Sequence, residues 1–181
     1  MKVVEEALNG LILLEPSVFG DERGYFFESF RQSKLDELLG ENLEFVQDNE
    51  SFSNKGVLRG LHFQAPPFAQ GKLVRVSAGA AMDVVVDIRK ESSSFGKHYS
   101  TILSEENKRV LWVPPGFAHG FVSLKNGTRF LYKCTAYYDK ESEGGLLWND
   151  PGLGIDWKLD DLIISDKDQE LPLLSNLKSP F

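Results

Sequence analysis

The clearest indication of the fold is the segment RVLWVPPGFAHGFVSLKNGTRFLYKCTAYY, residues 109–138. It contains three runs rich in β-branched and aromatic residues: RVLWV (109–113), GFVSL (120–124) and TRFLYKCTAYY (128–138). Such runs predict strands, and the turn-forming residues between them, Pro114–Gly116 and Asn126-Gly127, predict sharp reversals of the chain. An Asn-Gly pair between two apolar runs also predicts a β-hairpin. The segment therefore indicates an all-β domain.

The same pattern continues from this segment toward the N-terminus. Strand-like runs KLVRV (72–76) and MDVVVDIR (82–89) are followed by turn-forming residues at 77–79 and 92–96. Many short strands at close spacing predict a sandwich, a jelly roll or a barrel. No repeat or low-complexity linker interrupts the 181 residues, so we expect one domain that spans residues 1–181.

Helical signals are confined to two short stretches. Ser33 with Asp36 three residues later resembles a capping box, and Gly40 is a natural stop, so a helix is expected over residues 33–39. The loop-rich C-terminal part of the chain is expected to contain a second short helix near residues 160–164.

Composition limits the classes of function. The net charge of −7 argues against non-specific binding to nucleic acid. No apolar run has the length of a secretory signal or a membrane span, so no membrane partner is expected and the cytoplasm is the default compartment. The single cysteine, Cys134, rules out an intrachain disulfide and is expected to be a small buried residue.

Two of the three histidines lie in settings that favour function. His62 lies in LRGLHFQ and His119 directly follows the tight turn of PPGFAHGF, whereas His98 lies in a polar loop and is expected to be exposed. Metal-binding cupins usually carry two histidines two residues apart, then a carboxylate, then a later histidine after a Pro-x-Gly turn. His119 fits the later position, but Gln64 stands where the second histidine is needed. Two histidines and a glutamine are a poor ligand set for a transition metal, so we expect no catalytic metal.

Two arginines beside glycines are candidates for binding an anionic ligand. Arg23 lies in GDERGYFFE and Arg59 in VLRGLHF, and a neighbouring glycine lets a ligand approach the backbone closely. A guanidinium fork suits phosphate, while Arg75 and Arg89 are expected to be ordinary surface or ion-paired residues. No glycine-rich phosphate loop is present, so side chains would have to hold any phosphate.

His62, Tyr132 and Lys72 supply the residue types of an acid–base site. A histidine oriented by a carboxylate is a general base, a tyrosine can deliver a proton, and a lysine can stabilise an enolate oxygen. Residue types alone do not place the three in one pocket. Tyr132 lies in an aromatic-rich strand, where a role in core packing fits equally well.

A series of segments resembles, in order, the motifs of the dTDP-4-dehydrorhamnose 3,5-epimerase family. The segments are GDERGYFFESF, FVQDNESFS, GVLRGLHFQAPP, QGKLVRV, DVVVDIRKESSSFGK, PPGFAHGF, YKCTAYY and WNDPGLGIDW. PPGFAHGF is shared across cupins, but the ordered set, from about Phe19 to Asp168, is specific to this family. The resemblance implies an all-β fold, a cupin-like jelly-roll β-barrel with a few short helices, and a homodimer without metal or organic cofactor.

The resemblance also implies a substrate, a reaction and a set of site residues. The substrate would be dTDP-4-dehydro-6-deoxy-D-glucose and the product dTDP-4-dehydro-L-rhamnose, in the third step of dTDP-L-rhamnose synthesis. His62 matches the family's general base, Tyr132 its general acid, Asp168 the carboxylate that orients the histidine, and Lys72 the lysine near the C4 oxygen. Tyr137 is expected to stack on the thymine. The positions that match residues holding the nucleotide sugar are Arg23, Glu28, Gln47, Asn49, Arg59, His119, Glu143 and Lys167.

Other outcomes stay open at the level of sequence. Relatives that invert only C3 or only C5, and cupin ketoisomerases that act on the same substrate, differ by small changes in how the sugar is seated. A non-catalytic sugar-binding cupin would have no need of the set His62, Lys72, Tyr132 and Asp168. A metal-dependent cupin oxygenase would need the ligands that are missing around His62.

Overall fold

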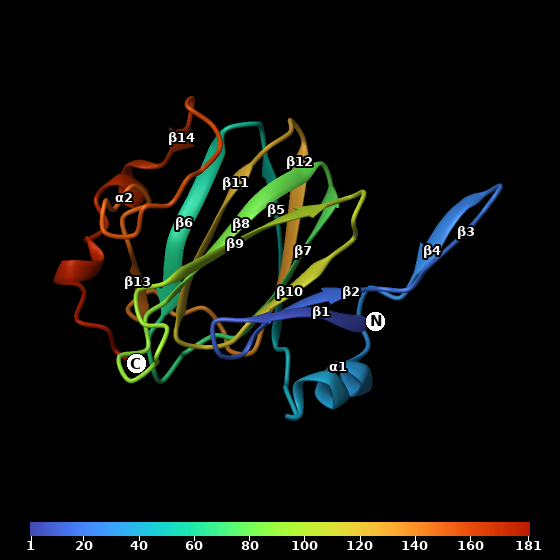
Figure 1. Cartoon of the computed structure of the whole chain (residues 1–181), viewed down its shortest axis with the longest axis horizontal. Coiled ribbons are helices and arrows are strands. Elements are labelled where there is room, and N and C mark those ends of the chain that lie inside the picture. Colours follow the sequence, from blue (N-terminus) through green and yellow to red (C-terminus); the bar gives the residue numbers. More distant parts are fainter.

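The computed structural model describes residues 1–181, which fold mainly into two facing antiparallel sheets (Figure 1). One sheet has the strand order β1-β2-β10-β7-β12-β5. Its strands are β1 (Lys2–Ala7), β2 (Leu11–Glu15), β10 (Val110–Val113), β7 (Lys72–Ala78), β12 (Thr128–Cys134) and β5 (Gln47–Ser53).

The other sheet has the order β13-β6-β11-β8-β9, with β14 added in parallel beside β6. Its strands are β13 (Glu143–Gly145), β6 (Val57–Gln64), β11 (Phe117–Ser123), β8 (Ala80–Asp87), β9 (His98–Ser104) and β14 (Ile163–Ile164). The smaller elements are the hairpin β3 (Val18–Asp21) and β4 (Gly24–Phe27), helix α1 (Gln32–Leu39), helix α2 (Asp166–Gln169) and the 3-10 turn η1 (Leu174–Asn176).

The all-β prediction is confirmed, but the predicted Asn126-Gly127 hairpin is wrong. The turn joins β11 to β12, which belong to different sheets and do not pair with each other. Both edges of β11 are already occupied, by β6 and by β8, so the strand after the turn has to cross to the facing sheet. An Asn-Gly pair specifies a tight reversal, but it does not specify which sheet the next strand joins.

Helix α1 begins before the residue predicted from the sequence. It starts at Gln32, and the residue before it, Arg31, provides no side-chain cap, so the expected capping box at Ser33 is absent. The expected stop is confirmed, because Gly40 has φ 71° and its N–H bonds the Asp36 carbonyl. Neither helix is long and apolar enough to cross a membrane.

The helix expected near residues 160–164 is also wrong. Ile163–Ile164 is the strand β14, and the Ile163 N–H donates a hydrogen bond of 2.8 Å to the Gly56 carbonyl. The helix starts later, after Ser165, whose side chain accepts a hydrogen bond from the Asp168 N–H. The capping serine therefore fixes the start of α2, and it also fixes the position of Asp168.

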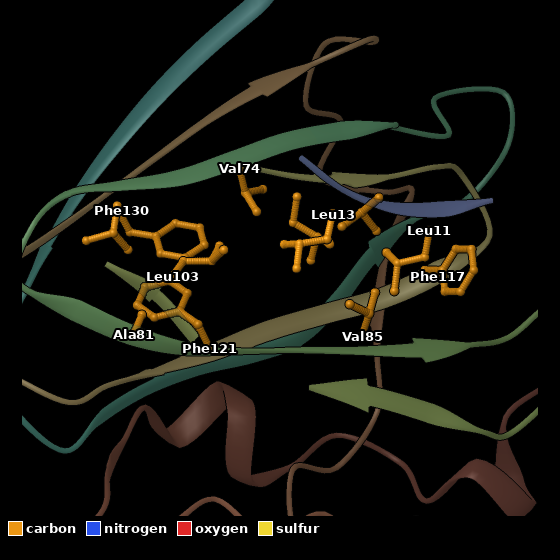
Figure 2. Packing of buried hydrophobic residues seen from close by; sticks show 12 residues of the cluster. Leu11, Leu13, Val74, Ala81, Val85, Leu103, Phe117, Phe121 and Phe130 are labelled. Atoms are coloured by element: carbon orange, nitrogen blue, oxygen red, sulfur yellow. The ribbon is translucent and has the colours of Figure 1, made fainter. Parts of the chain in front are cut away.

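The core lies between the two sheets. Leu13, Val74, Val85, Phe121 and Phe130 belong to this buried cluster, and Figure 2 shows them facing one another across the gap between the sheets. The rings of Phe121 and Phe130 stack with centroids 4.0 Å apart. A second cluster fills the space between the β6–β11–β8 sheet and the C-terminal segment, so β8 is buried on both faces.

A bulge in β6 directs two functional side chains to the same face. His119 of β11 pairs with His62, and Phe121 pairs with Arg59, so three steps on β6 match two steps on β11. The extra residue lets Arg59 and His62 both point into the barrel, which strict alternation would forbid. Gly60 within the bulge has φ +127°, and a Cβ there would lie 2.5 Å from the Gly120 Cα.

We predict that Gly60→Ala lowers the free energy of unfolding by about 3 kcal/mol or more, because backbone strain adds to a backbone clash. Urea titration measures the loss. Gly24→Ala is the matched control, since Gly24 has the same φ of +127° with nothing within 4 Å of the added Cβ. Equal losses in the two variants would show that the close approach of β6 to β11 is not what requires glycine.

Candidate active site

A cavity of about 560 Å³ opens between the two sheets. Its walls include seven residues predicted from the sequence to be functional, namely Arg59, His62, Lys72, His119, Tyr132, Lys167 and Asp168. A second cavity of about 340 Å³ adjoins it, because His62, Lys72 and Tyr132 line both. The second cavity adds Gln47, Asn49 and Glu143. The two together suit an elongated polar ligand.

His62 and Asp168 form a hydrogen-bonded pair. The Nε2 atom of His62 lies 2.7 Å from Oδ1 of Asp168, and Oδ2 accepts a hydrogen bond of 3.2 Å from the Gly60 N–H. Burial alone would raise the pKa of Asp168, but its bonds to His62 and Gly60 outweigh burial and hold that pKa below its usual value. Asp168 is therefore a carboxylate that fixes the ring of His62 and leaves the other ring nitrogen, Nδ1, free to act.

We predict that Asp168→Asn lowers kcat by about 10- to 100-fold with little change in KM, because the amide cannot hold the imidazole as the carboxylate does. Steady-state kinetics measure both constants. Asp166→Asn in the same helix is the control, since Asp166 is exposed and should leave kcat unchanged. A normal kcat for Asp168→Asn would mean that the pair has no role in turnover.

Tyr132 and Lys72 lie on the wall opposite His62. Tyr132 belongs to β12 and Lys72 to β7, neighbouring strands of one sheet, whereas His62 belongs to β6 of the facing sheet. Burial raises the pKa of the Tyr132 phenol, so this group keeps its proton. Burial lowers the pKa of the Lys72 ammonium, opposed by the charges of Cys134, Asp83 and Glu143. A ligand between the sheets would thus meet a base on one face and a proton donor on the other.

The lowered pKa of Lys72 and the raised pKa of Tyr132 predict which group controls the fall of kcat at alkaline pH. A lysine is charged below its pKa, so Lys72 loses its charge at a lower pH than a free lysine, whereas Tyr132 is still protonated there. We expect kcat to fall as pH rises through the lowered pKa of Lys72. Lys72→Arg should move this fall to higher pH, because guanidinium stays charged. If the pH at which kcat falls is the same in Lys72→Arg as in the wild-type enzyme, the fall is caused by another group.

Arg59 and Ser51 line the first cavity on the side of β5. The guanidinium of Arg59 donates to the Phe52 carbonyl and to Ser53 Oγ, both at 3.3 Å. The Ser51 hydroxyl is buried without any hydrogen-bond partner, which leaves it available to a ligand. Sequence reasoning missed Ser51. The signal was the alternation of uncharged polar residues at 47, 49 and 51 with the charged residues at 48 and 50, which fits an inner and an outer face of one strand.

A three-residue cluster borders the second cavity. The Lys167 ammonium lies 2.5 Å from Glu143 Oε2, and the Tyr138 hydroxyl donates to the same oxygen at 3.0 Å. The backbone N–H of Tyr138 also donates a hydrogen bond of 2.9 Å to the side-chain oxygen of Gln47, which holds Tyr138 in place. Tyr137, predicted as the stacking residue, is 65% exposed and lines neither cavity. Tyr138 does line the second one, and sequence reasoning did not separate the two neighbours.

Arg23 and Glu28 are not brought to the cavity of their own chain. Arg23 lies at the turn of the β3–β4 hairpin and pairs with Asp21, and Glu28 follows β4 and pairs with Arg31. Figure 1 shows this hairpin projecting away from the barrel, on the side opposite the C-terminal segment. The remaining sequence expectations are met for Cys134, which is buried, and for Arg89, which is ion-paired to Asp87.

His98 lies outside the site, at the start of β9, where it is partly buried and not fully exposed as expected. No group of three or more His, Cys, Asp or Glu side chains is arranged to hold a metal ion.

Comparison with known proteins gives a consistent result. Residues 5–176 match the family model described as dTDP-4-dehydrorhamnose 3,5-epimerase. The chain is 55% identical over 175 residues to the enzyme of that name from Salmonella typhimurium strain LT2, covering 96% of each chain.

Two solved structures are similar over nearly their whole length. The dTDP-4-dehydrorhamnose 3,5-epimerase of Elizabethkingia anophelis has TM-score 0.94 at 50% identity, with 99% of this chain and 98% of that chain covered. The dTDP-6-deoxy-D-glucose-3,5-epimerase of Legionella pneumophila, solved in complex with dTDP-4-keto-L-rhamnose, has TM-score 0.94 at 49% identity, covering 98% and 94%.

Proposed function

This chain belongs to the dTDP-4-dehydrorhamnose 3,5-epimerase family and is a carbohydrate epimerase with a cupin-like fold, and we propose that it works through His62 and Tyr132. Its substrate is dTDP-4-dehydro-6-deoxy-D-glucose and its product is dTDP-4-dehydro-L-rhamnose, the ligand that the related Legionella structure holds as dTDP-4-keto-L-rhamnose. The observation that supports the mechanism is the placement of His62 and Tyr132 on opposite walls of one cavity.

The first chemical step is removal of a proton beside the ketone. The C4 carbonyl acidifies the C–H bonds at C3 and C5, and His62 takes the proton from one of them. The electron pair of that C–H bond becomes the C–C double bond of an enolate, and the carbonyl electrons move to the C4 oxygen. The charge on Lys72 stabilises that oxygen, and losing one such donor typically costs about 3 kcal/mol of barrier.

The second step returns a proton to the opposite face. Tyr132 gives its phenolic proton to the same carbon as the enolate collapses to the ketone, which inverts the centre. Tyr132 then regains a proton and His62 releases one, both by exchange with water, so the couple is ready for the other carbon. Two passes invert C3 and C5, and neither pass changes the oxidation state of the sugar or calls for a metal or an organic cofactor.

The product assay tests this function. The purified enzyme is incubated with dTDP-4-dehydro-6-deoxy-D-glucose in the presence of a metal chelator, and the sugar is identified by NMR couplings. We expect the L-lyxo configuration of the doubly inverted sugar, at an unchanged rate after chelation. A product inverted only at C3 or only at C5 would instead assign a single-centre epimerase, and a keto group moved to C3 would assign a ketoisomerase.

We further propose a homodimer in which the β3–β4 hairpin of one chain completes the site of its partner. Phe19 and Phe26 of the hairpin are 66% and 71% exposed, which is unusual for large apolar side chains in a monomer. Arg23 at the hairpin tip cannot serve the cavity of its own chain, yet it matches a family position that holds substrate. Light scattering should give twice the mass of one chain.

Complementation tests the shared site. Arg23→Ala and His62→Asn are each expected to be nearly inactive, and co-expressing the two chains should restore activity. A mixed dimer has one complete site, with His62 from the first chain and Arg23 from the second. No recovery in mixed dimers would place Arg23 outside the partner's site. We also propose a cytoplasmic location, where the free thiol of Cys134 would stay reduced, and cell fractionation tests it.

A further inference from the structure

Asp83 is a buried carboxylate within an otherwise apolar stretch of β8. The strand reads AAMDVVVD and every residue in it is buried, with Asp83 at 0% exposure. Ala81 and Val85, two positions away on either side, belong to the cluster between the sheets, so Asp83 faces the interior of the barrel. A carboxylate in such a place is costly unless it has a strong partner. Core packing alone therefore gives no reason for an aspartate here.

The partner of Asp83 is His119. Nε2 of His119 lies 3.0 and 2.9 Å from the two carboxylate oxygens, and these are the only side-chain hydrogen bonds of Asp83. His119 itself is 7% exposed and lines the catalytic cavity. Its other nitrogen, Nδ1, has no protein partner and is not among the buried atoms that lack one, so it opens toward that cavity.

The cavity thus contains two Asp–His pairs in different surroundings. Asp168 has the Gly60 N–H as a second donor, so its negative charge is stabilised even when His62 is neutral. Asp83 has no donor besides His119, and an unpaired buried charge is strongly destabilising. The first pair leaves its histidine free to act as a base, whereas in the second the histidine is the only hydrogen-bond donor to the buried carboxylate.

We propose that Asp83 is a positioning residue that keeps His119 doubly protonated, so that its Nδ1–H acts beside Lys72 as a second donor to the enolate oxygen. The inference rests on the proposed epimerase function. His62 and Arg59 of β6 and Lys72 and Tyr132 of the facing sheet also line the cavity around His119. The Asp83 charge additionally favours the charged form of Lys72, against the lowering of the pKa by burial. One buried carboxylate would then support both donors.

The protonation state of His119 can be read directly by nitrogen NMR of histidine-labelled wild-type protein. We expect both ring nitrogens of His119 to carry protons at neutral pH. Asp83→Asn should remove one of them, and Asp168→Asn should leave both in place. A neutral His119 in the wild-type protein would overturn the proposal, whether or not any variant folds.

Kinetics supply the second readout. Asp83→Asn should lower kcat by about 10- to 100-fold with little change in KM. If Asp83 acts through His119, the double variant Asp83→Asn/His119→Ala should be no slower than His119→Ala alone. Independent, multiplying losses in kcat, or an unchanged kcat for Asp83→Asn, would overturn it. Turnover of the wild-type enzyme tests the epimerase function separately, so the two failures can be told apart.

Discussion

The His62→Asn variant is expected to lose on the order of 10³-fold in kcat, within the range for removal of a general base. Asparagine is polar but shorter than histidine, so it cannot replace Nε2 as the partner of Asp168, and it cannot accept a proton from carbon. The protein should stay folded, because the Oδ2 atom of Asp168 keeps its bond to the Gly60 N–H. Steady-state turnover of dTDP-4-dehydro-6-deoxy-D-glucose measures the loss.

The matched control is His98→Asn. His98 lies on β9 and lines neither cavity, so its replacement should leave kcat unchanged. Near-normal turnover by His62→Asn, with binding of the nucleotide sugar intact, would remove His62 from the mechanism. It would also leave the His62–Asp168 pair without a catalytic purpose.

The Tyr132→Phe variant is expected to separate proton removal from inversion. Phenylalanine preserves the packing of the ring but has no proton to give to the far face of the enolate. Formation of the inverted product should fall by about 10²- to 10⁴-fold, as for loss of a general acid. His62 can still remove a proton and return one to the same face, so exchange of sugar protons with solvent should persist. NMR of the sugar in D₂O measures both processes in one sample.

Tyr99→Phe is the control for this variant. Tyr99 packs against the same core but directs its hydroxyl to Glu5, outside the catalytic cavity. Its replacement should change neither exchange nor inversion. If Tyr132→Phe inverted the sugar at the normal rate, the proton would have to come from water or from another residue. Tyr132 would then not be the general acid, despite its position opposite His62.

The strands were predictable where the sequence has runs of β-branched and aromatic residues. The runs at 72–76, 82–89 and 109–113 all overlap observed strands, because such residues fit a pleated, buried surface. The partners of those strands were not predictable. Asn126-Gly127 gives a reversal in either arrangement, and only the occupied edges of β11 send the chain to the other sheet.

The site was predictable to the extent that the family motifs mark it. His62, Lys72, Tyr132 and Asp168 line one cavity, although 106 positions of the chain separate His62 from its hydrogen-bond partner Asp168. The sequence could not indicate that Gly60 turns Arg59 and His62 to the same face, since that depends on the register with β11.

Asp83 is a site residue that could not be predicted from the sequence. It is a single polar residue in an apolar run, and the same pattern is found at a strand end or at a solvent-facing position. Its meaning comes from His119, which lies 36 positions away and shares the inner face of a neighbouring strand. Tyr138 is similar, because it differs from Tyr137 only in which of the two reaches Glu143. Both depend on tertiary contacts that no local pattern encodes.

Deuterium incorporation at C3 and C5 in D₂O, compared between the wild-type enzyme and His62→Asn, tests whether one base, His62, serves both carbons through an enolate. We expect deuterium at both carbons with the wild-type enzyme and at neither, on the same time scale, with His62→Asn. Deuterium appearing at one carbon at the normal rate in His62→Asn would reveal a second base and contradict the one-base mechanism.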